Sequence, residues 1–229
     1  MLLSGQVAIV GGLSGLGGAV ARALGREGAA VVLGDPSEAA LAMIKQEVVD
    51  GGGVVRTVTT ELADEGDGAR LVQAALDAFG QLDVLVSNPR GVDVPEPFAA
   101  ADLDRWRREL DTTLFGSLQL ARAAIPPMRV ADRGSIVFVS AGVLREPAVQ
   151  QGARAAAYGA LLTASQVLAR ELGPAGIRVN TIVPRPAVGA STVGEPAGDP
   201  AADAVVFLAS ELAAVVTGQS LDVRTTTPS

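Results

Sequence analysis

The run of residues 5–17, Gly-Gln-Val-Ala-Ile-Val-Gly-Gly-Leu-Ser-Gly-Leu-Gly, most constrains what this chain can fold into. Residues 7–10 are apolar and partly β-branched, which is typical of a strand buried on both faces. Helical spacing of apolar residues begins after the glycines. Gly11, Gly15 and Gly17 separate the two patterns with the spacing G-x3-G-x-G. Such a strand, turn and helix either open a nucleotide-binding βαβ unit or form an ordinary tight turn of an α/β protein.

In the nucleotide-binding interpretation, each glycine has a physical task. One makes the turn, one lets the backbone approach a pyrophosphate, and one lets the helix pack closely on the strand. The N-terminus of the helix then faces the anion, which its free N–H groups favour. The turn residues expected at this cofactor site are Gly11, Ser14, Gly15, Leu16 and Gly17.

The rest of the chain continues the alternation of short apolar strands and helices. Of its 229 residues, 48% are hydrophobic but only 3% are aromatic, which suits a parallel sheet covered by alanine-rich helices. We therefore expect one domain over residues 1–229: a Rossmann-like, doubly wound parallel β-sheet of about seven strands with helices on both faces. Residues 184–200 lack apolar periodicity, and we expect them to form a short lid over a substrate.

Composition excludes several classes of function. The chain has no Cys and no His, so disulfides and thiol chemistry are excluded, and no metal site is expected. The net charge is −7, and the one arginine cluster, within residues 105–108, is expected to be a solvated helix face rather than a nucleic-acid site. No apolar run reaches membrane-spanning length. These features predict a cytoplasmic protein that binds neither nucleic acid nor membrane.

Several further motifs extend over nearly the whole chain. They are residues 82–86 (Leu-Asp-Val-Leu-Val) shortly before an Asn, 134–137 (Gly-Ser-Ile-Val), 176–180 (Gly-Ile-Arg-Val-Asn) and 217–219 (Thr-Gly-Gln). Together with the glycine turn, they resemble the short-chain dehydrogenase/reductase (SDR) family. The resemblance implies a nicotinamide cofactor and hydride exchange between a carbonyl and an alcohol. The family's chemistry uses a Tyr, a Lys one helical turn later, a Ser on the fifth strand and an Asn on a long helix.

The family's Tyr falls on Tyr158, the only tyrosine of the chain. A phenol titrates near pH ~10, so it needs a nearby cation to act as a base at neutral pH. The family's Lys position is Leu162 here, and the one lysine, Lys45, lies on a different helix. Arg154, one turn before Tyr158, has the charge but is a poor proton relay. We expect Arg154 to face solvent.

The other two catalytic positions of the family also differ. The Ser position is Ala141, or Ser140 if the register slips by one residue, and the Asn position is Thr113. Three of the four positions are therefore altered, and residues that act as one catalytic unit fail together. We expect an SDR-like oxidoreductase homologue that is impaired or silent in ordinary hydride transfer. The alternative is an active, atypical NAD-linked enzyme that uses Tyr158 with Ser140 or a water.

The cofactor is expected to be NAD rather than NADP. Asp35 follows the second strand, where a carboxylate accepts ribose hydroxyls and repels a 2′-phosphate; it is equally consistent with a turn residue before Pro36. Asn88 matches the family's Asn after the fourth strand. Arg90 and Arg185 occupy family glycine positions, where each either blocks the cofactor or binds an anion, such as the carboxylate or phosphate of a non-redox substrate.

Partners follow only from the resemblance. The family forms dimers and tetramers through its two long helices, so we expect a homodimer or homotetramer, or a hetero-oligomer with a complete SDR homologue. Leu110, Leu114, Leu118 and the Ala/Leu face of residues 155–168 are the candidate contact, with ordinary core packing as the alternative. The small-molecule substrate is not indicated by any motif.

Overall fold

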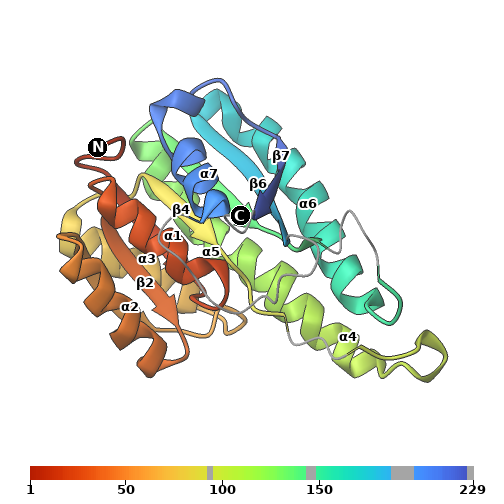
Figure 1. Cartoon of the computed structure of the whole chain (residues 1–229). Coiled ribbons are helices and arrows are strands. Elements are labelled where there is room, and N and C mark those ends of the chain that lie inside the picture. The colour runs from red at the N-terminus through yellow and green to blue at the C-terminus, as the bar shows by residue number, and fades with distance from the viewer. Residues whose placement is uncertain (92–94, 143–147, 187–198, 226–229) are drawn as a thin grey trace.

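The computed structural model describes residues 1–91, 95–142, 148–186 and 199–225, in which seven parallel strands form one sheet (Figure 1). The strand order is β3-β2-β1-β4-β5-β6-β7, so the chain winds outward in both directions from β1. The predicted doubly wound, Rossmann-like sheet is confirmed. The strands are β1 (Val7–Gly11), β2 (Ala30–Asp35), β3 (Val54–Thr59), β4 (Val84–Ser87), β5 (Gly134–Val139), β6 (Ile177–Pro186) and β7 (Ser220–Thr225).

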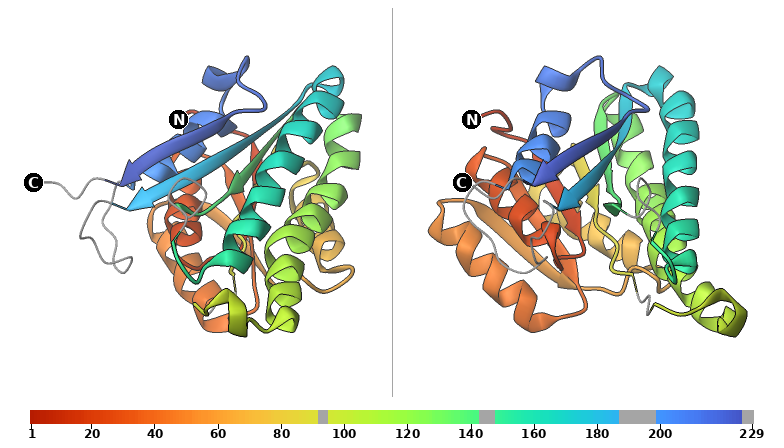
Figure 2. Two further views of the ribbon diagram at one scale, coloured as in Figure 1. Left: turned by 90° about the vertical axis from the view of Figure 1, so that its right-hand side faces the viewer. Right: turned by 45° about the vertical axis from the view of Figure 1, so that its right-hand side comes forward.

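Helices cover both faces of this sheet, as Figure 2 shows. The red, orange and blue helices α1, α2 and α7 lie on one face, and the gold, green and teal helices α3, α5 and α6 lie on the other. The shorter α4 extends away from the body in line with α5 (Figure 1). The helices are α1 (Leu16–Arg26), α2 (Glu38–Asp50), α3 (Asp67–Phe79), α4 (Leu103–Leu110), α5 (Gly116–Val130), α6 (Gly152–Leu172) and α7 (Pro200–Ala209).

Alternation along the strands divides the buried residues into two cores. Successive side chains of a strand point to opposite faces, so Val137 packs with α1, α2 and α7 while its neighbours Ile136 and Phe138 pack with α3, α5 and α6. The same split runs through β1, where Ala8 and Val10 belong to the first core and Val7 and Ile9 to the second. Burial on both faces explains why the strands read as continuous apolar runs.

The long helix before β5 differs from the sequence prediction. The pair Pro126-Pro127 predicts that the helix ends there, because proline does not continue a helix, but α5 runs through both residues to Val130. The prolines lie in its last turns, and the helix still closes because Ala131 donates its N–H to the Pro127 carbonyl at 3.1 Å. The two prolines therefore lack only their own backbone N–H donors, and they do not end the helix. A second difference is a π-helical turn, Asp111–Phe115, between α4 and α5.

The segment expected to form a lid, residues 184–200, lies only partly within the described residues. Strand β6 continues to Pro186, and α7 begins at Pro200 with Asp199 as its N-cap, whose carboxylate accepts the Ala201 N–H at 2.8 Å. Residues 187–198 lie outside the described residues, so the lid stays a prediction. Among the described helices, none combines the length and apolar character that a bilayer crossing requires.

Candidate active site

The glycine turn lies at the carboxyl edge of the sheet, where β1 ends and α1 begins. Gly12 has φ +89°, and a Cβ there would lie 2.0 Å from the Asn88 carbonyl oxygen. A Cβ on Gly17 would lie 2.0 Å from the Gly12 carbonyl oxygen. Gly15 has φ +58° and is exposed, as is Ser14. The turn is thus a tight backbone cradle with an open rim, and it can be built only from glycines at 12 and 17.

Gly12 is a residue that the sequence interpretation missed, because the G-x3-G-x-G spacing does not include it. The available signal was the doubled glycine at the end of the strand, since a second consecutive glycine marks a place where the chain needs a positive φ. Gly11, which the spacing does include, is a glycine because a side chain there would clash with the core. A Cβ there would lie 2.7 Å from a methyl carbon of Leu120 on α5.

Asn88, directly after β4, holds the glycine turn in shape. Its side-chain nitrogen donates to the carbonyls of Gly12 and Ser14 at 3.0 and 2.8 Å. Its backbone N–H donates to the Gly11 carbonyl at 2.8 Å. Both amide hydrogens therefore bond to the turn, so Asn88 stabilises the backbone conformation of the turn.

Asp35 ends β2 and also binds the turn. One carboxylate oxygen accepts the Leu13 N–H at 2.8 Å, and the other accepts the Ser37 N–H at 2.9 Å. The turn-residue interpretation therefore has direct geometric support. The same side chain lines a cavity, and each carboxylate oxygen keeps a further lone pair, so a ribose hydroxyl can still donate to it.

That cavity has a volume of about 500 Å³ and lies beside the glycine turn. Arg90 is exposed at its wall, and Thr60, after β3, is buried with a hydroxyl that has no hydrogen-bond partner among the described residues. Arg185, the other arginine at a family glycine position, lies half-buried on β6 and is not among the lining residues. The lining residues are Gly12, Gly34, Asp35, Pro36, Thr60, Glu61, Leu62, Asn88, Pro89, Arg90, Gly91 and Thr112.

Tyr158 lies on α6 and is almost fully buried, with 3% of its surface exposed. Its hydroxyl donates to the Pro89 carbonyl at 3.2 Å, which brings it next to the segment that lines the cavity. Burial raises the pKa of the Tyr158 phenol above its ordinary value because the apolar surroundings disfavour the phenolate. The charge of Arg154 opposes this rise, and the Glu109 carboxylate adds to it.

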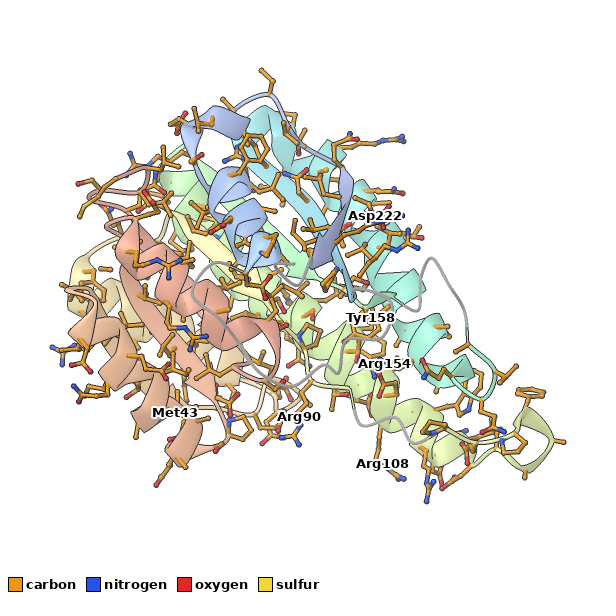
Figure 3. All side chains as sticks on the ribbon, in the orientation of Figure 1. Met43, Arg90, Arg108, Arg154, Tyr158 and Asp222 are labelled. Carbon is orange, nitrogen blue, oxygen red and sulfur yellow. The ribbon has the colours of Figure 1, made fainter. Side chains whose placement is uncertain are left out.

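Arg154 does not face solvent, so that prediction is wrong. Its guanidinium carbon lies 5.8 Å from the centroid of the Tyr158 ring, and the residue is half-buried (Figure 3). Helical spacing places residues four apart on the same side of α6, and α4 packs against that side, so the arginine folds over the ring instead of extending outward. A cation over an aromatic face is an attractive arrangement.

The remaining family positions offer Tyr158 no polar partner. Leu162 lies half-buried one turn further along α6. Ser140 is buried and its hydroxyl makes no hydrogen bond to any described residue, Tyr158 included. Strand alternation places Ser140 on the same face as Phe138, the face that α6 covers, while the half-buried Ala141 follows outside the strand.

Thr113, at the family's Asn position, is fully buried in the π-helical turn. Its hydroxyl donates to the Glu109 carboxylate at 3.0 Å, and its carbonyl accepts the Ser117 hydroxyl at 2.7 Å. Ser117 in turn accepts the Ser87 hydroxyl at 3.0 Å. Thr113 is therefore part of an internal chain of hydrogen bonds between α5 and β4. Single π-turns inside helices occur frequently at functional sites.

Comparison with known proteins gives consistent matches. The family model described as short chain dehydrogenase matches residues 6–194. Cis-4-hydroxycyclohexanecarboxylate dehydrogenase of Sinomonas cyclohexanicum is 32% identical over 236 residues, covering 95% of this chain and 94% of that protein. L-rhamnose 1-dehydrogenase (NAD(P)(+)) of Azotobacter vinelandii is 33% identical over 251 residues, covering 96% of each. The crystal structure of a short-chain dehydrogenase/reductase from Burkholderia xenovorans aligns with a TM-score of 0.86 and 27% identity, covering 96% of this chain and 95% of that one.

Proposed function

Because the chain belongs to the short-chain dehydrogenase family, we propose that it binds a nicotinamide dinucleotide at the glycine turn but transfers hydride poorly between ordinary alcohols and carbonyls. When bound, the cofactor supplies the hydride or accepts it. The part assigned to this chain's own residues is to hold the dinucleotide and to move a proton at the substrate oxygen.

The residues around the turn fit a dinucleotide. Gly12 and Gly17 keep a backbone cradle free of side chains, and the exposed Ser14 and Gly15 precede the N-terminus of α1, where a pyrophosphate is favoured. Asp35 keeps lone pairs for ribose hydroxyls, and its charge disfavours the 2′-phosphate of NADP, so we propose NAD.

The observation that carries the proposed impairment is the state of the Tyr158 phenol. It is buried, donates to a backbone carbonyl, and has a pKa raised by its surroundings, while the next turn of α6 presents Leu162. Even at the ordinary pKa near 10, only about one phenol in a thousand is ionised at neutral pH. A raised pKa lowers this fraction further, so Tyr158 is a weak base for oxidising an alcohol.

A second candidate function is that of an active but atypical NAD-linked dehydrogenase. It is favoured by one observation, the Arg154 guanidinium over the Tyr158 ring, because that cation lowers the cost of forming the phenolate. Relatives carry names such as cis-4-hydroxycyclohexanecarboxylate dehydrogenase, so a hydroxyl on a small ring or sugar is the substrate class to try first.

We also propose that the chain assembles as a homodimer or homotetramer, or with a complete SDR homologue that supplies the activity. Leu110, Leu114 and Leu118 are half-buried, so part of each is available to a partner. Phe115, between α4 and α5, and Val167, on α6, expose about half of their surface on the same long helices, at 51% and 50%.

Calorimetric titration of the purified full chain with NAD and with NADP tests the proposal. We expect NAD to bind, NADP to bind more weakly, and the NAD complex to oxidise simple alcohols slowly or not at all. Binding of neither nucleotide, together with no gain in thermal stability at millimolar concentration, would remove the cofactor part of the proposal. Fast oxidation of an alcohol at neutral pH would remove the impairment.

A further inference from the structure

The Arg154 side chain is unusual for a half-buried arginine. Its Nε atom is fully buried and has no hydrogen-bond partner among the described residues. None of the ion pairs between described residues includes it, although seven other pairs involve arginines elsewhere on the chain. Its guanidinium instead lies against the face of the Tyr158 ring, as Figure 3 shows for the two labelled side chains. Because Arg154 makes no ion pair with any described residue, its charge acts mainly on the Tyr158 side chain beside it.

The charges that act on the phenol come from two helices. Arg154 of α6 favours the phenolate, while Glu109 of α4 disfavours it. Glu109 is itself buried, with 1% of its surface exposed, and accepts the Thr113 hydroxyl at 3.0 Å. Among the described residues after β4, Pro89 contributes the carbonyl that accepts the hydroxyl proton. Arg154 is thus the favourable charge at this group.

We propose that Arg154 is the positioning cation of this site, stabilising the ionised form of Tyr158 from one turn before it, because Leu162 supplies no cation from one turn after it. This inference rests on the proposed function in one respect, that Tyr158 is the group that exchanges a proton with the substrate. Arg154 acts on the reaction through Tyr158, because it favours the ionised phenol.

An arginine in this role has a chemical consequence. A guanidinium stabilises a neighbouring anion but is a poor proton relay. The proton of Tyr158 therefore leaves through the substrate or through water rather than along α6. A phenol stabilised by a cation but without a proton relay is expected to give slow turnover that rises toward alkaline pH.

The chain offers a direct measurement because Tyr158 is its only tyrosine. In the full-length protein labelled with ¹³C at the tyrosine ring carbon that bears the oxygen, a single NMR signal reports ionisation of this phenol as pH is raised. The variants are Arg154→Gln and Arg154→Met, which remove the charge, and Arg154→Lys, which keeps it. Arg170→Gln, at an exposed arginine in the last turn of α6, is the matched control.

We expect the midpoint of the Tyr158 titration to rise by about one pH unit in Arg154→Gln and in Arg154→Met, which is about tenfold less phenolate at a given pH. Arg154→Lys and Arg170→Gln should stay within about 0.3 unit of the wild type. A purely structural role for Arg154 would lower thermal stability in the neutral variants without this pattern, and lysine would not rescue it.

The same comparison is made in a Leu162→Lys background. There the added lysine ammonium lowers the pH at which Tyr158 ionises, so that the titration is complete before the protein unfolds in alkali. An Arg154→Gln midpoint that equals or lies below that of its parent, in both backgrounds, would overturn the inference. That result would leave the proposed function intact. Fast neutral turnover by the wild type would instead contradict the proposed function while leaving the titration difference as predicted.

Discussion

The glycine turn and the surroundings of Tyr158 lie at the same edge of the sheet but are built in opposite ways. In the turn, Asn88 and Asp35 bind the backbone through three side-chain hydrogen bonds, all 3.0 Å or shorter. Around Tyr158, the hydroxyl donates to a backbone carbonyl at 3.2 Å and also interacts with the Arg154 side chain. Ser140 and Arg154 each leave a buried polar atom without a partner in the described part of the chain.

This difference assigns cofactor binding to the glycine turn and proton transfer to the surroundings of Tyr158. A backbone cradle depends on shape, and the turn keeps that shape through contacts within the chain. Acid–base chemistry depends on charge at one atom, and the described charges that act on Tyr158 are those of Arg154 and Glu109. We therefore expect substitutions in the turn to change cofactor affinity and stability strongly, and substitutions near Tyr158 to change proton chemistry with a smaller effect on the fold.

Gly12→Ala tests the turn most severely. The new Cβ would lie 2.0 Å from the Asn88 carbonyl oxygen at a φ of +89°, so we expect a loss of about 2–5 kcal/mol in the free energy of unfolding and no NAD-induced thermal shift. Gly80→Ala is the matched control, since no atom lies within 4 Å of its Cβ and only its left-handed backbone is strained, at about 1 kcal/mol. Equal melting temperatures for the two variants would show that the close approach of Gly12 is not required.

Asn88→Ala is expected to have the next largest effect. It removes the donors to the Gly12 and Ser14 carbonyls, which costs about 1–3 kcal/mol, and a loosened turn should bind NAD about tenfold more weakly. Ser87→Ala is the control because its hydroxyl bonds Ser117 on the other side of the strand. The comparison is made by calorimetric titration, and unchanged affinity in Asn88→Ala would contradict the supporting role.

Asp35→Ala should change cofactor selectivity more than stability. Removing the carboxylate takes away both the acceptor for ribose hydroxyls and the charge that repels a 2′-phosphate, so the ratio of NAD to NADP affinity should fall about tenfold. The Leu13 and Ser37 N–H groups also lose their acceptor, at a cost of about 1–2 kcal/mol. If the affinity ratio stays constant while stability falls, Asp35 is a turn residue only.

Leu162→Lys should improve the chemistry modestly. An ammonium one turn after Tyr158 lowers the pKa of the phenol, and we expect the rate of NAD-dependent alcohol oxidation at neutral pH to rise about tenfold. Leu162→Met, which keeps an apolar side chain of similar size, serves as the control. A rate that is equal in both variants would mean that ionisation of Tyr158 does not limit turnover.

The smallest expected effect concerns stability in alkali. The pKa of Tyr158 is raised in the folded state, so the folded chain keeps its proton at a pH where the unfolded chain, titrating near ~10, has released it. The stability of the wild type should therefore decrease above about pH 10 more steeply than that of Tyr158→Phe. Urea denaturation at a series of pH values measures this, and parallel curves would contradict the raised pKa.

Local patterns predicted the fold because its determinants are local. Apolar runs such as Val84–Ser87 predict strands buried on both faces. Serine is a favoured N-cap residue, and Ser37 caps α2 by accepting the Ala40 N–H at 3.2 Å. The end of α5 was mispredicted because the effect of Pro126 and Pro127 depends on how far they lie from the last turn of the helix. The π-helical turn has no local signature in the sequence.

The candidate site was predicted only in part, for the same physical reason. The turn glycines, Asp35 and Asn88 could be located because each directly follows or ends a strand. The place of Arg154 could not, since its side chain is directed by α4 packing against α6, a contact between segments about fifty residues apart. The need for glycine at position 12 likewise comes from Asn88, which lies far along the chain.

The most direct test of the central claim compares the rate of NAD-dependent alcohol oxidation by the wild type with that by Tyr158→Phe, at saturating NAD and neutral pH. The account holds that the Tyr158 phenol is protonated and ineffective as a base under these conditions. It predicts two low rates that agree within about threefold, since general-base catalysis, where it operates, contributes about 10²–10⁴-fold. A high wild-type rate that falls by that factor in Tyr158→Phe would contradict it.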